Sequence, residues 1–178
     1  MARKRGRESA RDMIYSMGAV LVAVLIILGI TYRSHQQISQ PVDFNSALKS
    51  AVTQSNWPIL VPSNSPSNYR LSAARFEPES YGSQGQMRWY LGYQTSENQY
   101  VSLWQSDGPT DAIVTAASNN GECTAKVTVS GNEWTSCFQR KPVTRALYRT
   151  FDHQTVIVSG TLNQKQMETF ASQLQPAK

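Results

Sequence analysis

The stretch Gln86–Ser106 reads QMRWYLGYQTSENQYVSLWQS and decides the fold of the larger part of the chain. Apolar and polar residues alternate along it with a period of two, which is the pattern of strands that bury one face. Ser96-Glu97-Asn98 interrupts the alternation as a turn, so the stretch predicts an antiparallel hairpin with strands 86–95 and 99–106. The first strand places four apolar side chains on one face: Met87, Trp89, Leu91 and Tyr93.

The aromatic residues of this hairpin leave two interpretations open. Aromatic side chains mostly pack in a core, because each of them buries a large apolar area. Two wide strands, however, hide both of their faces only if helices cover each side. The second interpretation is therefore a partly exposed platform for a sugar or a peptide, formed by Tyr90, Tyr100 and Trp104.

Helix and strand patterns continue on both sides of the hairpin. Helices are expected at 44–53 after the cap Asp43, from Pro109 to about residue 117, and after Asn163, with Gln166 at the capping-box position. The last helix has a predicted buried stripe of Met167, Phe170, Ala171 and Leu174. Further strands are expected at 69–76, 123–129, 132–139, 143–151 and 155–162, and the segment with Pro58, Pro62 and Pro66 is expected to be extended.

Short connections join these consecutive strands, which favours antiparallel neighbours. The sequence therefore predicts an α+β domain with an antiparallel sheet of about six or seven strands, packed by two or three helices.

An apolar segment precedes this domain. Residues 13–32, MIYSMGAVLVAVLIILGITY, contain no charge over 20 residues, which is long enough for one transmembrane helix. Basic residues flank its N-terminal side, so we expect the N-terminus inside the cell and the domain outside. The alternative is a cleaved signal peptide, but the apolar run is long and ends in Thr31-Tyr32-Arg33, a poor cleavage site. The topology signal consists of Arg3, Lys4, Arg5, Arg7 and Arg11.

The expected organisation follows from this segment. It consists of a basic cytoplasmic tail (1–12), a single N-in transmembrane helix (13–32), a polar stalk (33–41) and an extracytoplasmic domain (42–178). The formal net charge is +5, but the tail alone holds five basic and two acidic residues. The domain is thus close to neutral, and we expect no nucleic acid as a partner.

Cys123 and Cys137 both lie in the expected extracytoplasmic domain, where disulfides persist. A two-residue turn at Ser130-Gly131 places Cys123 opposite Phe138, whereas a three-residue loop places it opposite Cys137. A bulge between Trp134 and Cys137 would reconcile the apolar pattern with a disulfide. The bond would stabilise the fold by ~3 kcal/mol if its effect is to lower the entropy of the unfolded chain by closing this loop.

One cluster of basic residues stands out in the domain: Arg140, Lys141, Arg145 and Arg149. Arg145 and Arg149 are four residues apart, so they share one face of a strand. The cluster is either a solvated face of the sheet or a docking patch for an anionic envelope polymer or an acidic partner.

Several short motifs together resemble those of an actinobacterial family of single-pass envelope proteins with an extracytoplasmic domain of unknown function. The motifs are RDM (11–13), ILVP (59–62), ARF (74–76), GY (92–93), QSD (105–107), GNEW (131–134) and TVIVSG (155–160). The resemblance implies an N-in anchor and an outer domain, and it implies no catalytic residue. The order of elements is also loosely similar to that of PsbP-like and Mog1-like domains.

Candidate catalytic groups are few. The only histidines are His35, in the stalk, and His153, in a turn, and no G-x-S-x-G motif is present. Glu77 and Glu79 could pair for glycoside cleavage, but Pro78 between them favours a loop. Ligand spacings for zinc are absent from the sequence.

We therefore expect a non-enzymatic membrane protein of the cell envelope, without cofactor or metal, whose domain binds a protein partner or a cell-wall component. The alternative is a small-ligand or lipid-binding domain with a pocket between sheet and helix; a hydrolase has less support.

Overall fold

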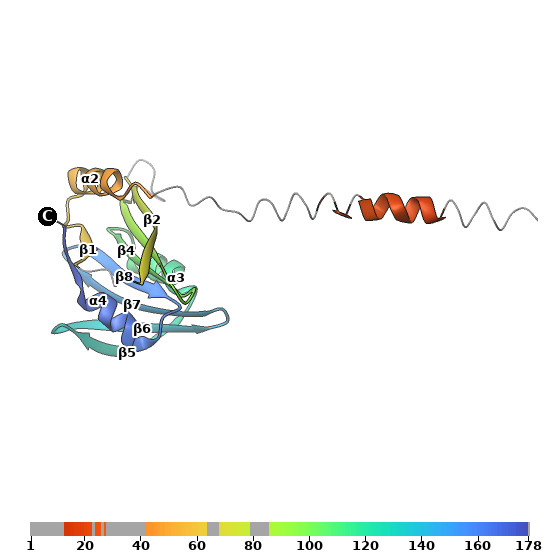
Figure 1. Cartoon of the computed structure of the whole chain (residues 1–178). Helices are drawn as coiled ribbons and strands as arrows, with labels where there is room; N and C mark the ends of the chain where they lie inside the picture. Colours follow the sequence, from red (N-terminus) through yellow and green to blue (C-terminus); the bar gives the residue numbers. More distant parts are fainter. Residues whose placement is uncertain are drawn as a thin grey trace, which may run out of the picture. The chain divides into compact units, whose positions relative to one another are not determined.

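The computed structural model describes residues 13–22, 24, 25, 27, 42–63, 68–78 and 86–177. The chain divides into two compact units, Met1–Gln40 and Pro41–Lys178 (Figure 1). Three sequence predictions lie outside the described residues: the basic tail, the stalk and the position of Glu79.

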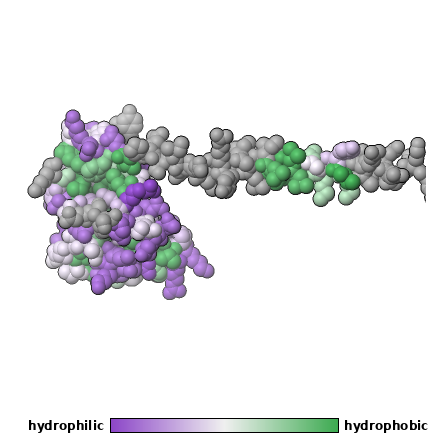
Figure 2. All heavy atoms as spheres, in the orientation of Figure 1, coloured by the Kyte–Doolittle hydropathy of each residue, from purple (hydrophilic) through white to green (hydrophobic). Residues whose placement is uncertain are grey.

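In the first unit, residues 13–22 form a helix. Its side chains are mostly apolar and exposed, among them Met13, Ile14, Met17 and Leu21 (Figure 2). Within the described part of the chain, no helix combines the length and the apolar character needed to cross a membrane. Most positions of the predicted span beyond residue 22 lie outside the described residues.

The second unit is built on a seven-stranded sheet in which every pair of neighbours is antiparallel, in the order β2-β3-β4-β8-β7-β6-β5. The predicted α+β class and the predicted sheet are thereby confirmed. The strands are β2 (Tyr69–Glu77), β3 (Arg88–Thr95), β4 (Tyr100–Ser106), β5 (Glu122–Val129), β6 (Asn132–Arg140), β7 (Val143–Phe151) and β8 (Gln154–Gly160).

Three helices accompany the sheet: α2 (Phe44–Gln54), α3 (Thr110–Ser118) and α4 (Gln164–Ser172). The predicted caps are confirmed, because Asp43 accepts a hydrogen bond from Ser46 N and Asn163 forms a capping box with Gln166. Pro109 is the N-cap of α3 and not, as predicted, its first helical residue. Helix α3 ends at Ser118, close to the predicted residue 117, and its C-cap Asn119 adopts the left-handed conformation that asparagine tolerates.

The helices lie on opposite faces of the sheet. On one side, which we call the α2/α4 face, α4 buries Met167 and Phe170 against Trp89, Leu103 and other residues of the main core. On the other side, the α3 face, Ile113, Val114 and Ala117 pack on Cys137, Ala146 and Ile157. Strand alternation separates the two cores, since Leu103 and Trp104, or Ile157 and Val158, point to opposite sides.

A second, two-stranded sheet was not predicted. β1 (Leu60–Pro62) pairs with β9 (Leu174–Pro176), so Leu174 belongs to a strand and the helix prediction was wrong at this residue. Gln105, fully buried, holds β1 to the large sheet. Its Oε1 accepts from Leu60 N at 2.7 Å, and its Nε2 donates to Pro58 O at 3.1 Å.

The hairpin of β5 and β6 resolves the two predicted registers. The turn has two residues, Ser130 and Gly131, both with positive φ as a type I′ turn requires. Val127 lies opposite Trp134, and Cys123 nevertheless lies opposite Cys137. A bulge does reconcile the two patterns, but its extra residue is Thr124 on β5, and not a residue between Trp134 and Cys137.

Candidate functional site

Helix α3 covers only part of its face of the sheet, because it packs mainly on β8, β7 and β6, with Trp104 of β4 at the edge of its cluster (Figure 1). Three of the predicted platform residues lie on the remaining strands of that face. Tyr90 belongs to β3, and Tyr100 and Trp104 belong to β4; each of the three is partly exposed. Trp89 and Tyr93 point to the α2/α4 face and are buried. The core interpretation is therefore confirmed for Trp89 and Tyr93, whereas Tyr90, Tyr100 and Trp104 are partly exposed on the other face and the platform stays a prediction.

The exposed aromatic side chains are held in fixed positions. The rings of Tyr90 and Trp104 meet edge to face with their centroids 4.9 Å apart. Trp104 Nε1 donates a hydrogen bond to Ser102 Oγ at 2.8 Å. The hydroxyl groups of Tyr90 and Tyr100 are hydrogen-bonded to each other. These bonds orient the rings before any ligand arrives.

Two arginines from neighbouring positions lie over these rings. The guanidinium of Arg75 is 6.0 Å from the centre of Tyr90, and that of Arg88 is 5.9 Å from the centre of Trp104. Both distances are within the range of cation–π attraction. We call this set the aromatic–arginine surface: Arg75, Arg88, Tyr90, Tyr100 and Trp104.

The charge of this surface is positive. Glu77 neutralises Arg88, whose Nε donates to Glu77 Oε2 at 2.9 Å. Arg75 is exposed, and no described residue accepts a hydrogen bond from its guanidinium. Burial, and then the hydrogen bond to Tyr100, raise the pKa of Tyr90, so its hydroxyl remains neutral. Among the residues that the structure describes, the surface thus offers one guanidinium without an ion pair beside the aromatic rings.

The predicted basic cluster lies elsewhere. Arg145 and Arg149 share a strand face, as predicted, but this is the α2/α4 face. Arg145 lies 5.0 Å over Phe138, and Arg149 lies 4.2 Å over Phe151; burial lowers the pKa of Arg149. Arg140 and Lys141 are exposed at the turn after β6. The structure does not bring these four residues together with Tyr90, Tyr100 and Trp104.

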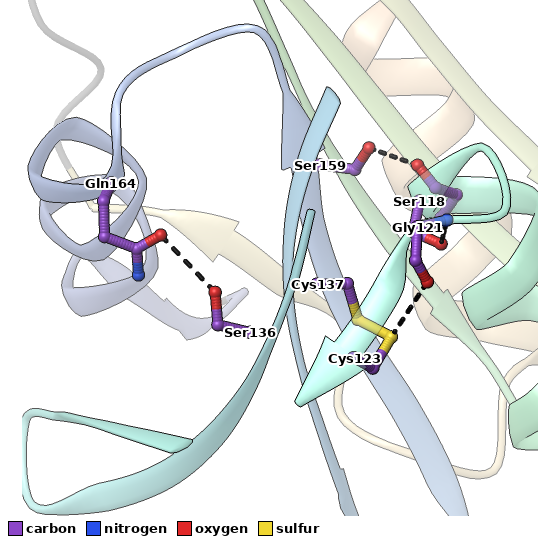
Figure 3. Close-up of a disulfide and its surroundings, with 8 residues drawn as sticks. Ser118, Gly121, Cys123, Ser136, Cys137, Ser159 and Gln164 are labelled. Atoms are coloured by element: carbon purple, nitrogen blue, oxygen red, sulfur yellow. Dashed lines mark hydrogen bonds between the residues drawn. A yellow bond between two sulfur atoms is a disulfide. The ribbon is translucent and has the colours of Figure 1, made fainter. Parts of the chain in front are cut away.

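Cys123 and Cys137 form a disulfide, as predicted, with their Cα atoms 3.9 Å apart. Figure 3 shows the bond between β5 and β6, close to Ser118 and Gly121 at the end of α3. Cys137 is buried, and the disulfide packs against the apolar side of α3. Its position under a helix indicates a structural role.

Of the candidate catalytic residues, the structure describes His153 and Glu77. His153 is exposed in the turn between β7 and β8, and Glu77 is engaged by Arg88. Among the residues that the structure describes, no three His, Cys, Asp or Glu side chains group in a way that could hold a metal ion.

Arg75 and Arg88 were missed in the sequence. Arg88 precedes Tyr90 by two residues on one strand, which is a local signal for a shared face. Arg75 comes next to Tyr90 only through the pairing of β2 with β3, which includes a register shift between Leu71 and Ala73. That shift is not readable from the pattern of the residues.

A comparison with curated proteins found no match. A family model described as a protein of unknown function, DUF4245, matches residues 5–174. The match covers both units of the structure and agrees with the resemblance to a family without a known activity. The chain belongs to the DUF4245 family.

Proposed function

We propose that this chain is a membrane-anchored, non-enzymatic protein of the cell envelope whose outer domain binds an anionic glycan through the aromatic–arginine surface. The observation that carries the proposal is Arg75, whose guanidinium has no ion pair within the described part of the chain and lies over a fixed, partly exposed aromatic ring. Aromatic rings pack against the apolar faces of sugars, and a guanidinium binds carboxylate or phosphate with two parallel hydrogen bonds.

Stacking on Tyr90 suits Arg75 to this task. A cation over a ring loses conformational freedom before binding, which lowers the entropic cost of the complex. The N–H groups of the guanidinium remain available, because no described residue accepts a hydrogen bond from them. Arg88 already donates a hydrogen bond from its Nε to Glu77. Arg75 is therefore the residue that we expect to bind the anion.

Anchoring by residues 13–32 is the second part of the proposal. Its support is the uncharged run of 20 residues, the basic residues that precede it, and the helix at 13–22. Protease added outside intact cells should remove the domain, and alkaline carbonate should leave the chain in the membrane fraction. Release of the intact chain by carbonate, or protection of the domain from protease, would contradict the anchor or its direction.

Glycan binding is tested with the full chain in detergent, on immobilised polygalacturonate, with neutral dextran as the reference polymer. Arg75→Gln should weaken binding about tenfold, because a charge-assisted hydrogen bond is lost. Trp104→Ala should also weaken it, and Arg140→Gln, on the opposite face of the sheet, should leave it unchanged. Added salt should weaken binding of the native protein more than that of Arg75→Gln.

Equal losses in Arg75→Gln and Arg140→Gln would mean that the polymer senses only net charge, and the proposal would fail. Absence of binding to polygalacturonate would also count against it. Cross-linking in native membranes would then test a protein partner for the same surface, with Trp104→Ala as the variant that should lose the cross-link.

A further inference from the structure

Two hollows meet at Tyr69, at the end of the sheet where β2 begins. The first, of about 260 Å³, lies between Tyr69 and the residues of α4, including Lys165, Gln166 and Thr169. The second, of about 430 Å³, is lined by Tyr69, Arg70 and the turn between β3 and β4. We call the two hollows together the Tyr69 cleft.

Neutral polar side chains outnumber the charged ones along this cleft, which are Lys165 and Arg70, and much of the open surface of the first hollow is apolar. Its walls carry amides and hydroxyls, for example Asn163, Thr169 and Gln173 on the α4 side and Gln94 and Thr95 on the other. None of the described residues that line it carries a carboxylate. Such walls offer donors and acceptors together, which matches a ligand with several hydroxyl groups.

An aromatic wall lies between these polar groups. The rings of Tyr69 and Phe170 are stacked, with centroids 6.4 Å apart and planes inclined by 24°. Tyr69 is partly exposed, so part of this apolar wall remains open to a ligand. Burial, and then the charge of Glu97, raise the pKa of Tyr69, which keeps its hydroxyl a neutral donor.

Gln173 supplies the most specific sign of a ligand. Its Oε1 atom is buried and has no hydrogen-bond partner within the described part of the chain, although the residue lines the first hollow. A buried acceptor without a donor is unfavourable in the free protein. Because this atom is closed off from solvent, the Gln173 side chain would have to rotate toward the first hollow, where a hydroxyl group of a ligand would satisfy it.

From this arrangement we infer that the Tyr69 cleft is a second binding site, which takes one or two neutral, hydroxyl-rich rings of a sugar. The first hollow is smaller than the ~300 Å³ at which pockets for drug-sized ligands begin, so it fits a single ring. The inference is independent of the aromatic–arginine surface, because the cleft shares no residue with it and needs no charge on the ligand.

The test uses the full chain in detergent, with cellobiose and chitobiose as probes. Saturation-transfer NMR detects contact, and calorimetry measures affinity. Gln173→Met replaces the unpaired amide with an apolar side chain of similar length. It should weaken binding about fivefold, while the melting temperature stays unchanged or rises, since an unsatisfied buried acceptor has been removed.

Tyr69→Phe, which keeps the ring and removes the hydroxyl, should also weaken binding. Gln139→Met is the matched control, because Gln139 lies on β6 and donates to Asn119 O at 3.2 Å, outside the cleft. This variant should bind as the native chain does.

The inference is overturned if neither disaccharide binds at about 10 mM, where even a millimolar Kd is detected. It is also overturned if Gln173→Met and Tyr69→Phe bind with native affinity. Polygalacturonate retention by Gln173→Met should remain native, which separates this outcome from a failure of the proposed function.

Discussion

Removal of the disulfide is the perturbation whose energetic effect the structure defines best. Cys123 and Cys137 are separated by 14 positions in the sequence, and closing a loop of this length lowers the entropy of the unfolded chain by an amount worth ~3 kcal/mol. Cys137 is 1% exposed and packs under α3. Truncation of its sulfur therefore leaves a small void, which adds about 1 kcal/mol. The double variant Cys123→Ala/Cys137→Ala should lose about 4 kcal/mol of unfolding free energy.

Reduction of the native chain separates the two contributions. Dithiothreitol breaks the covalent bond but leaves both sulfur atoms in place, so reduced native protein should lose only the ~3 kcal/mol of loop closure. Dithiothreitol should leave the stability of the double variant unchanged. The expected order of stability is thus oxidised native protein, reduced native protein, and double variant.

Urea unfolding followed by tryptophan fluorescence measures all three species. Trp89 and Trp134 are buried, so the signal reports loss of the packed sheet. The slope with urea should rise when the bond is absent, because an uncrosslinked unfolded chain exposes more surface. Unfolding free energies of reduced and oxidised native protein within about 0.5 kcal/mol of each other would refute the reasoning from loop entropy.

Three further perturbations have defined outcomes. Gly160→Ala should lower stability by roughly 1–3 kcal/mol or more, because the added Cβ would lie 2.1 Å from Tyr100 O; a native melting temperature would contradict this close approach. Asn163→Ala removes the acceptor for Gln166 N and should cost about 1 kcal/mol in urea unfolding, an effect that Asn163→Asp should avoid. The raised pKa of Tyr90 means that folding favours the protonated phenol, so its contribution is complete below the ordinary value of 10.0 and is lost as the pH rises above it. Tyr90→Phe should flatten the fall of stability between about pH 10 and pH 12, and an unchanged fall would contradict the assignment.

The predictable parts of this fold are those that neighbours in the sequence determine. The cap at Asp43, the capping box after Asn163 and the alternation at Met87–Tyr93 all depend on residues a few positions apart, and each is confirmed. The pairing of β1 with β9 joins residues more than 100 positions apart and leaves no local pattern. Leu174 fits a helical stripe by spacing, and the pairing with Pro62 takes it into a strand.

The candidate site also has a part that the sequence predicts and a part that it does not. Alternation along β3 and β4 is sufficient to place Tyr90 and Trp104 on one face and Trp89 on the other. The neighbour of Tyr90 across the sheet depends on register, so Arg75 could not be found from the sequence. The basic cluster was predicted because its residues are close in the sequence. The guanidinium groups of Arg145 and Arg149, however, lie over the rings of Phe138 and Phe151 on the other side of the sheet.

The open part of the α3 face follows from the dimensions of the elements. Seven strands at about 4.8 Å spacing make a sheet roughly 30 Å wide, whereas a helix with its side chains is about 10 Å across. One helix of nine residues, about 14 Å long, therefore covers only a fraction of a face. Packing mainly on β6–β8 leaves β2 and β3 outside the main contacts of α3, and Trp104 on β4 packs against the edge of the cluster under α3. Small polar residues such as Ser102 would suffice at uncovered positions, so burial by α3 explains part of Trp104 but not Tyr90. The ring of Tyr90, held by its hydrogen bond to Tyr100 and flanked by Arg75, is the part of this face that the proposed glycan site would account for.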